Sequence, residues 1–252
     1  MLLINKPSGP TSHDIVDEVR RITGERRVGH AGTLDPFAEG LLIVLVGREE
    51  TRRQAEFLNM DKVYETTFIL GEERDTDDLT GKIRVGTAEP LSLEPRSARS
   101  SGSLPLPLGL RPRSAGTEPA SPPRDSRVQS SAVPKITEIK KTLKKYLGEQ
   151  EQLPPIYSAK KLKGKKAYEL ARKGEVPELK PKKVKIYELE ILDYKYPELK
   201  IRTRVSSGTY IRALARDIGR ELGTGAYVSE LKRTQIGSYK LENAKTLEEL
   251  KK

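Results

Sequence analysis

The sequence predicts an α+β fold in which helices flank a mixed, mostly antiparallel sheet. Segments with helical spacing and segments with strand-like alternation interleave without the regular strand–helix–strand rhythm of a parallel sheet. No internal repeat is evident. The 252 residues are enough for one large domain with a sizeable core.

The first fifty residues predict a strand, a helix, a loop and a strand. Residues 1–7 are typical of a short strand. Thr11 and Asp14 have the spacing of a capping box, and Gly24 is a natural helix end. Between them, four apolar residues follow at helical spacing: Ile15, Val16, Val19 and Ile22.

Residues 29–36 place one carboxylate in a glycine-rich loop, just before the unbroken apolar run of residues 41–46. The two glycines permit positive φ and close backbone approach. Pro36 biases Asp35 toward an extended backbone. The apolar run predicts a fully buried strand, so we expect the loop to hold Asp35 rigidly at the edge of a sheet.

The remaining elements follow from the same periodicities. Strands are expected at residues 63–70, 184–192 and 199–205. Helices are expected at residues 136–147, 160–173, 212–222 and after Thr246, whose capping box includes Glu249. The acidic residues 75–78 form a loop that is either a cation site or a solvated turn; they lack the glycine and terminal Glu of a calcium loop, which favours the turn.

Residues 86–134 differ from the rest of the chain. They hold nine of the seventeen prolines and ten serines, with no lysine and no aromatic residue. Such a segment cannot bury enough surface to offset the entropy of ordering, so we expect a disordered insertion. The alternative is a regulatory or RNA-contacting arm.

The charge indicates a polyanionic partner. The net charge is +11 and the pI about 9.6. This balance favours RNA or DNA, although a lysine-rich surface alone would produce it too. Basic side chains are densest over residues 160–185, where eleven face only three glutamates.

Several classes of site are excluded. The chain has no cysteine and only two histidines, His13 and His30, which excludes disulfides, zinc–thiolate sites and iron–sulfur clusters. It carries no P-loop and no dinucleotide fingerprint, so we expect no metal and no cofactor. No apolar run approaches a membrane span and the N-terminus lacks a signal-peptide layout, so we expect a cytoplasmic protein. Many Lys and Glu with few Met fit a thermophile.

Six segments resemble, in the same order, the motifs of the TruB family of tRNA pseudouridine synthases. They are NKPSGPTS at residues 5–12, GHAGTLDP at 29–36, KVY at 62–64, QLPPIYSAK at 152–160, VSSGTYIR at 205–212 and LKRTQIG at 231–237. The resemblance covers the whole chain apart from residues 86–134.

The resemblance implies the pseudouridine synthase fold. Residues 1–85 and 135–252 together would form one catalytic domain, with residues 155–183 as an RNA-binding thumb. The implied activity is conversion of uridine to pseudouridine in the tRNA T-loop, conventionally at uridine-55, with the base flipped into a pocket. The isomerisation gains and loses no atoms and needs no cofactor. We expect a monomer that binds tRNA; the chain ends before the C-terminal PUA-type domain that the family usually carries.

The resemblance also implies roles for individual residues. Asp35 would act as a nucleophile or as a base, and Arg212 would pair with it, because a guanidinium fork favours an ionised carboxylate. Tyr64 would stack on the base and accept its C5 proton. His30 would fill the space that the flipped base leaves. The expected substrate contacts are His30, Gly32, Thr33, Lys6, Tyr210, Leu231, Lys160, Lys161 and Lys163.

Each of these residues has an ordinary alternative. Arg212 by itself would be a surface arginine at a helix start, Tyr64 a half-buried strand tyrosine, and His30 a loop residue bonded to its own turn. Two other functions also stay open. One is an RNA-guided pseudouridine synthase of the archaeal and eukaryotic branch, and the other is a non-catalytic RNA-binding or tRNA-folding module.

Overall fold

The computed structural model describes residues 1–84, 133–157, 161–162, 165–166 and 179–251. Lys160, Lys163 and nearly all of the segment predicted to be a disordered insertion lie outside these residues. Over the described part of the chain, no helix is long and apolar enough to cross a membrane.

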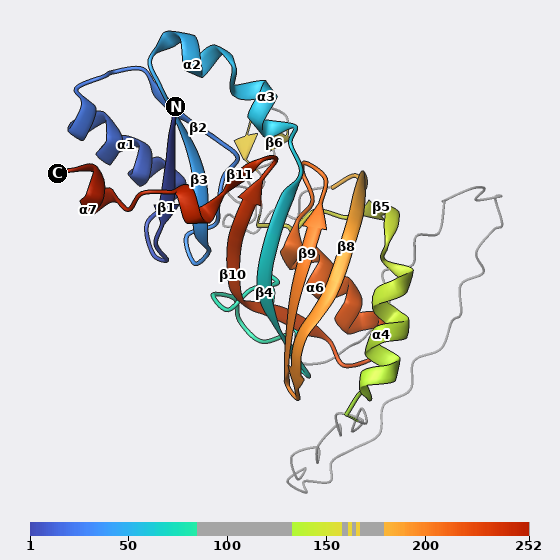
Figure 1. Ribbon diagram of the computed structural model, residues 1–252. Coiled ribbons are helices and arrows are strands. Elements are labelled where there is room, and N and C mark those ends of the chain that lie inside the picture. Colours follow the sequence, from blue (N-terminus) through green and yellow to red (C-terminus); the bar gives the residue numbers. More distant parts are fainter. Residues whose placement is uncertain (85–132, 158–160, 163–164, 167–178, 252) are drawn as a thin grey trace, which may run out of the picture.

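One nine-stranded sheet runs through the molecule (Figure 1). Its path is β1-β3-β10-β4-β9-β8-β5, with β2 beside β3 and β11 beside β10. The strands are β1 (Leu2–Lys6), β2 (Val28–Ala31), β3 (Glu39–Val46), β4 (Lys62–Leu70), β5 (Gly148–Gln152), β8 (Lys182–Lys195), β9 (Glu198–Val205), β10 (Ala226–Ile236) and β11 (Tyr239–Lys240). Every pair is antiparallel except β3 with β10, so the predicted mixed, mostly antiparallel sheet is confirmed.

The helices cover parts of this sheet. They are α1 (Ser12–Thr23), α2 (Arg48–Arg52), α3 (Gln54–Leu58), α4 (Ile136–Lys145), α6 (Ile211–Glu221) and α7 (Leu247–Leu250), with a 3₁₀ turn at Leu241–Asn243. The largest core cluster joins α4 and α6 to β4, β8, β9 and β10. A second cluster packs α1 on β1 and β3, close to α7 near the C-terminus.

The sheet divides beside β3, and this division positions the predicted loop. Glu39 and Gly40 of β3 pair in parallel with β10, whereas residues 43–46 pair with β2. Both partners therefore lie along the same edge of β3. The loop that leaves β2 after Ala31 emerges between them, next to the β10 backbone.

Several local predictions are confirmed. Thr11 caps α1 in a capping box with Asp14, and Gly24 ends the helix with φ +69°. The alternation of β9 is as expected, with Leu199 and Ile201 buried in the core. Thr246 forms the predicted capping box at α7.

Other predictions are wrong. Residues 28–31 form a strand, so the predicted loop is shorter than expected. The helix predicted over residues 160–173 is contradicted where the structure describes it, because β6 (Lys161–Leu162) pairs with β7 (Lys165–Lys166). Helix α4 ends at Lys145 and leaves Ile136 and Leu147 exposed at the ends of the predicted stripe.

Sequence periodicity does not predict β10, although this strand lies within the sheet between β3 and β4. Its register with β4 shifts between Val228 and Glu230 and again between Arg233 and Gln235. Each such bulge adds one residue and reverses the alternation of inward and outward side chains. The strand therefore lacks the simple period of two by which strands are recognised.

We predict that Gly40→Ala is strongly destabilising. A Cβ there would lie 2.9 Å from the backbone nitrogen of Arg233, at a φ of +103°. The Gly47→Ala control shares a positive φ of +88° but has nothing within 4 Å. We expect Gly47→Ala to lower the free energy of unfolding by about 1 kcal/mol and Gly40→Ala by at least about 2 kcal/mol more. Denaturant unfolding measures both, and equal losses would contradict the close approach of β3 and β10.

Candidate active site

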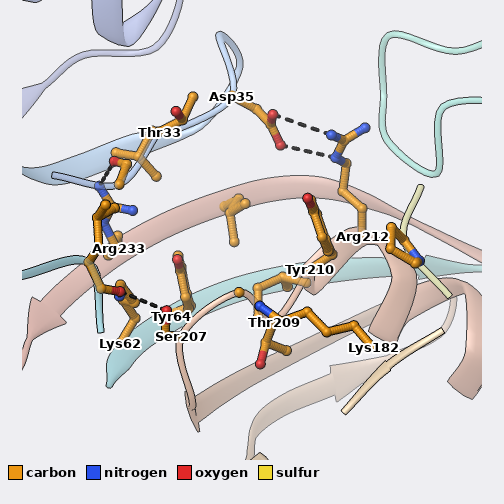
Figure 2. Close-up of a pocket in the computed structure, with 17 residues that line it drawn as sticks. Thr33, Asp35, Lys62, Tyr64, Lys182, Ser207, Thr209, Tyr210, Arg212 and Arg233 are labelled. Atoms are coloured by element: carbon orange, nitrogen blue, oxygen red, sulfur yellow. Dashed lines mark hydrogen bonds and ion pairs between the residues drawn. The ribbon is translucent and has the colours of Figure 1, made fainter. Parts of the chain in front are cut away.

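A cavity of about 550 Å³ is lined mainly by the loop after β2, the start of β4, the turn after β9, the start of α6 and the end of β10, with single residues from α3, the chain after β5 and β8 (Figure 2). Its volume falls within the usual range of small-ligand sites. Seven of the predicted site residues line it: Gly32, Thr33, Asp35, Tyr64, Tyr210, Arg212 and Leu231.

Lys6 binds the backbone of the loop that carries Asp35. Its ammonium donates to the carbonyl oxygens of Pro7, Pro36 and Ala38, at 2.8, 3.2 and 2.7 Å. Burial lowers the pKa of Lys6 to about 8, against the opposing effect of the Asp35 carboxylate. Lys6 was predicted to contact substrate; it is fully buried and lies outside the cavity lining, so its position is that of a support for the loop.

The loop is also fixed on the side that precedes Asp35. The hydroxyl of Ser12 accepts the Leu34 N–H at 2.8 Å and donates to the Leu34 carbonyl at 3.0 Å. Arg233 donates from Nη2 to the Gly32 carbonyl at 3.0 Å. Side chains from two other elements therefore set the backbone on which Asp35 is presented.

Arg212 binds Asp35 through one hydrogen bond and one further ion-pair contact. Its Nε lies 3.0 Å from Oδ2 and its Nη2 lies 3.3 Å from Oδ1 (Figure 2). The other three N–H groups donate to the Thr76 carbonyl at 2.9 Å, to Asp78 Oδ2 at 3.1 Å and to the Tyr157 carbonyl at 3.0 Å. The four N–H groups on Nη1 and Nη2 of this buried guanidinium therefore all have acceptors, and its Nε lies in ion-pair contact with Asp35. The surface position that an isolated helix-start arginine would take is therefore excluded.

Helix α6 carries two more arginines on the same face, one and two turns further along. Arg216 donates to Asp77 Oδ2 at 3.0 Å, and Arg220 binds Glu73 through two bonds of 2.9 Å. Positions four apart on a helix lie one above the other, so α6 presents a column of three guanidinium groups. This column binds the acidic segment that follows β4.

The acidic segment corrects a prediction. Asp77 and Asp78 are buried in ion pairs, so the solvated turn expected at residues 75–78 is wrong. Asp77 adopts a φ of +59°, and burial raises its pKa against the opposing effect of Arg216. Among the described residues, no group of three or more His, Asp or Glu has an arrangement that would hold a metal ion.

Apolar and aromatic side chains also line the cavity. Tyr64 comes from β4 and Leu231 from β10, and both are largely buried. Tyr210 directly precedes α6, and its backbone N–H and carbonyl bind the side chain of Gln152 at 2.8 and 3.0 Å. A flat ring or base that entered the cavity would meet these side chains beside Asp35.

Two family models match the chain. One, described as TruB family pseudouridylate synthase (N terminal domain), matches residues 20–98 and 118–211; the other, tRNA pseudouridylate synthase B C-terminal domain, matches residues 212–252. The chain belongs to the TruB family of pseudouridylate synthases. It is therefore an isomerase that converts uridine to pseudouridine.

Relatives of the TruB family align over nearly the whole chain. The protein named tRNA pseudouridine synthase B from Protochlamydia amoebophila is 40% identical over 243 residues, which cover 96% of this chain and 76% of the relative. The Aquifex aeolicus protein of the same name is 39% identical over 250 residues, covering 98% and 72%. Among solved structures, a chain of a Cbf5-Nop10-Gar1 complex superposes with a TM-score of 0.62 at 26% identity, covering 98% of this chain and 52% of that one. These matches confirm the predicted pseudouridine synthase fold.

Not every predicted site residue lies in the TruB cavity. His30 is half-buried in β2 and does not line the cavity. Burial lowers its pKa, and Arg233 and His13 lower it further; its buried Nδ1 has no hydrogen-bond partner among the described residues. Lys160, Lys163 and the side chain of Lys161 lie outside the described residues, so their predicted contacts with RNA stay predictions.

Some cavity residues were missed by sequence reasoning. Lys62, Ser207 and Arg233 line the cavity beside the predicted residues, and so does Lys182, which was expected only as one of the basic residues of the 160–185 segment. The first three stood within the quoted motifs KVY, VSSGTYIR and LKRTQIG. The sequence could not show that Lys62 and Arg233 lie close together, because about 170 positions separate them.

We predict that Lys6 makes the stability of the protein depend on pH. Its pKa is about 8 in the folded chain against an ordinary 10.5. Between these values the unfolded chain binds more protons, so the free energy of unfolding rises with pH. Relative to Lys6→Met, the unaltered chain should gain at most about 3 kcal/mol from pH 8 to 10.5. Denaturant unfolding of both proteins over this range measures the difference, and parallel profiles would contradict a lowered pKa.

Proposed function

We propose that this enzyme isomerises the T-loop uridine of tRNA, conventionally uridine-55, and that Asp35 carries the chemistry. The names of the relatives support tRNA as the substrate. The observation that carries the proposal is the pairing of Asp35 with the buried Arg212 at the edge of a nucleotide-sized cavity. The Asp35 side chain is 36% exposed, so it is held in place and is still reachable from the cavity.

The reaction breaks the C1′–N1 bond of uridine and joins C1′ to C5. The carboxylate of Asp35 acts either as a nucleophile or as a base that removes a proton, and both routes require its ionised form. The hydrogen bond from Arg212 Nη2 and the ion-pair contact from its Nε hold that ionised form in one orientation. The proton on C5 then leaves, and the hydroxyl of Tyr64 is the cavity group that we assign to accept it.

Access to Asp35 requires the base to leave its stack. Flipping costs a few kcal/mol, which contacts inside the cavity must offset. Tyr64 and Tyr210 offer ring faces for the uracil, and Leu231 an apolar wall. We assign His30 to the space that the base vacates, since His30 lies at the end of β2, directly before the loop that carries Asp35.

The basic composition supports an RNA substrate. The net charge is +11, and lysines crowd residues 160–185. Contacts between these side chains and phosphates would supply affinity that falls with salt, while the shape of the folded T-loop would supply selectivity.

We predict that Asp35→Asn abolishes turnover and leaves tRNA binding nearly unchanged. The substrate is an unmodified tRNA transcript tritiated at uridine C5, from which isomerisation releases tritium. Release by the unaltered enzyme only, with the product mapped to the T-loop uridine, is the expected result. Loss of both turnover and affinity in Asp35→Asn would make Asp35 a structural residue.

The same assay separates the alternatives. Release without added proteins or guide RNA argues against an RNA-guided enzyme. That alternative follows from the sequence resemblance, and chains from Cbf5 complexes share the fold of this chain. Salt-sensitive tRNA binding without any release would instead support a binding module.

We predict that Arg212→Lys lowers single-turnover tritium release by about 100-fold or more, because an ammonium cannot hold both oxygens of Asp35. The affinity for tRNA should change much less. Arg220→Lys is the matched control, since Arg220 lies on the same helix and binds only Glu73. Equal loss in the two variants would show that the effect is on the helix as a whole.

A further inference from the structure

The cavity has a second charged wall, away from Asp35. Arg233 of β10 is 1% exposed and Lys62 of β4 is 5% exposed. Both line the cavity (Figure 2). Neither forms an ion pair with any described residue within 4.0 Å.

The hydrogen bonds of these two side chains go to neutral acceptors. Arg233 donates from Nε to the Leu41 carbonyl at 2.8 Å and from Nη2 to the Gly32 carbonyl. Lys62 donates to the Leu58 and Met60 carbonyls, at 2.7 and 2.6 Å. Among the described residues, one N–H of Lys62 and three of Arg233 have no acceptor.

The other buried cations of the site have carboxylate partners or use all their N–H groups in hydrogen bonds. Arg212 and Arg216 each bind carboxylates. Lys6 uses all three of its N–H groups on carbonyls and does not line the cavity. Buried charges ordinarily have a partner, so the wall formed by Lys62 and Arg233 presents positive charge that is not neutralised within the described protein.

The electrostatics of Lys62 supports this description. Its pKa is lowered to about 8, first by burial and then by Arg233, with Lys182 adding to the shift. Asp61 opposes the shift but ranks below Arg233. Arg233 and Lys182 therefore both repel Lys62, and an anion placed between Lys62 and Arg233 would relieve the larger of these two repulsions.

Gly32 leaves room for such an anion. A Cβ on Gly32 would lie 3.6 Å from Arg233 Nη1 and 4.0 Å from Lys62 Cε. The absent side chain thus keeps open the surface that both cations flank. Thr33 follows directly and also lines the cavity.

We propose that Lys62 and Arg233 form a phosphate site that binds a phosphodiester adjoining the target uridine. This inference rests on the proposed function, which places the ribose at Asp35. A phosphate attached to that nucleotide must then lie within the same cavity or at its rim. Of the cations lining the cavity, Arg212 is neutralised by Asp35 and Asp78 and Lys182 is exposed, so Lys62 and Arg233 are the buried pair that is left for the phosphate. A guanidinium beside an ammonium offers the charge-assisted donors that phosphate oxygens bind.

The first test is the salt dependence of tRNA binding. We expect Lys62→Met to raise the Kd for an unmodified tRNA transcript about tenfold at low salt. The slope of log Kd against log salt should fall by about one, as for the loss of one phosphate contact. Lys200→Met is the control, because Lys200 is exposed on β9 and faces away from the core. A folded Lys62→Met with the slope of the unaltered enzyme would overturn the proposal.

The second test locates the phosphate. A single methylphosphonate, which is uncharged, replaces each phosphate around the target uridine in turn. One position should weaken binding to the unaltered enzyme and have little further effect on Lys62→Met, whereas Lys62→Arg should keep the sensitivity. No sensitive position with the unaltered enzyme would overturn the proposal, even if Lys62→Met failed to fold.

These tests measure binding and not turnover, so they separate this inference from the proposed function. Tritium release from the T-loop with no methylphosphonate effect would support the proposed function and overturn the phosphate site. A methylphosphonate effect around a different uridine, with no T-loop product, would support the phosphate site and overturn the T-loop assignment.

Discussion

The rest of the site depends on the hydrogen bonds and ion pairs of one buried guanidinium. Arg212 joins the loop of Asp35, the acidic segment after β4 and the chain that leads out of β5, through four hydrogen bonds from Nη1 and Nη2 and an ion-pair contact from Nε. Removal of any one acceptor would leave a buried charged donor unpaired, which is among the costliest defects that a folded protein can carry. The position of the carboxylate is thus tied to three other segments at once.

Helix α6 extends this constraint beyond a single residue. Its period places Arg216 and Arg220 in line with Arg212, and each binds an acid of the segment after β4. Arg216 also donates to the Leu153 carbonyl at 3.0 Å, near the Tyr157 carbonyl that Arg212 holds. One helix therefore fixes both the acidic segment and the start of the predicted thumb. The geometry at Asp35 follows from the register of α6 against the sheet.

The two ends of the cavity differ in how their charge is balanced. At one end the Asp35 carboxylate and Arg212 neutralise each other, and the apolar wall of Leu231 lies beside them. At the other end Lys62 and Arg233 form no ion pair with any residue that the structure describes. A uridine nucleotide has the matching division, since its base is neutral and its phosphates are anionic. An arrangement of this kind selects both the substrate and its orientation, because the reverse placement would put phosphate against the carboxylate.

The sequence by itself determined the elements whose residues repeat with a simple period or carry a local cap. These include α1 with Thr11, the buried strand β3 and the alternating β9. The motif residues also identified Asp35, Tyr64 and Arg212. Only the tertiary structure decided the course of β10, whose two bulges erase the alternation, and the burial of Asp77 and Asp78. Those carboxylates can be buried because they form ion pairs with Arg212 and Arg216, which lie more than 130 positions away in the sequence. Local periodicity depends on neighbouring residues and can be recognised from the sequence. The pairing of buried charges depends on which distant segments the fold brings together.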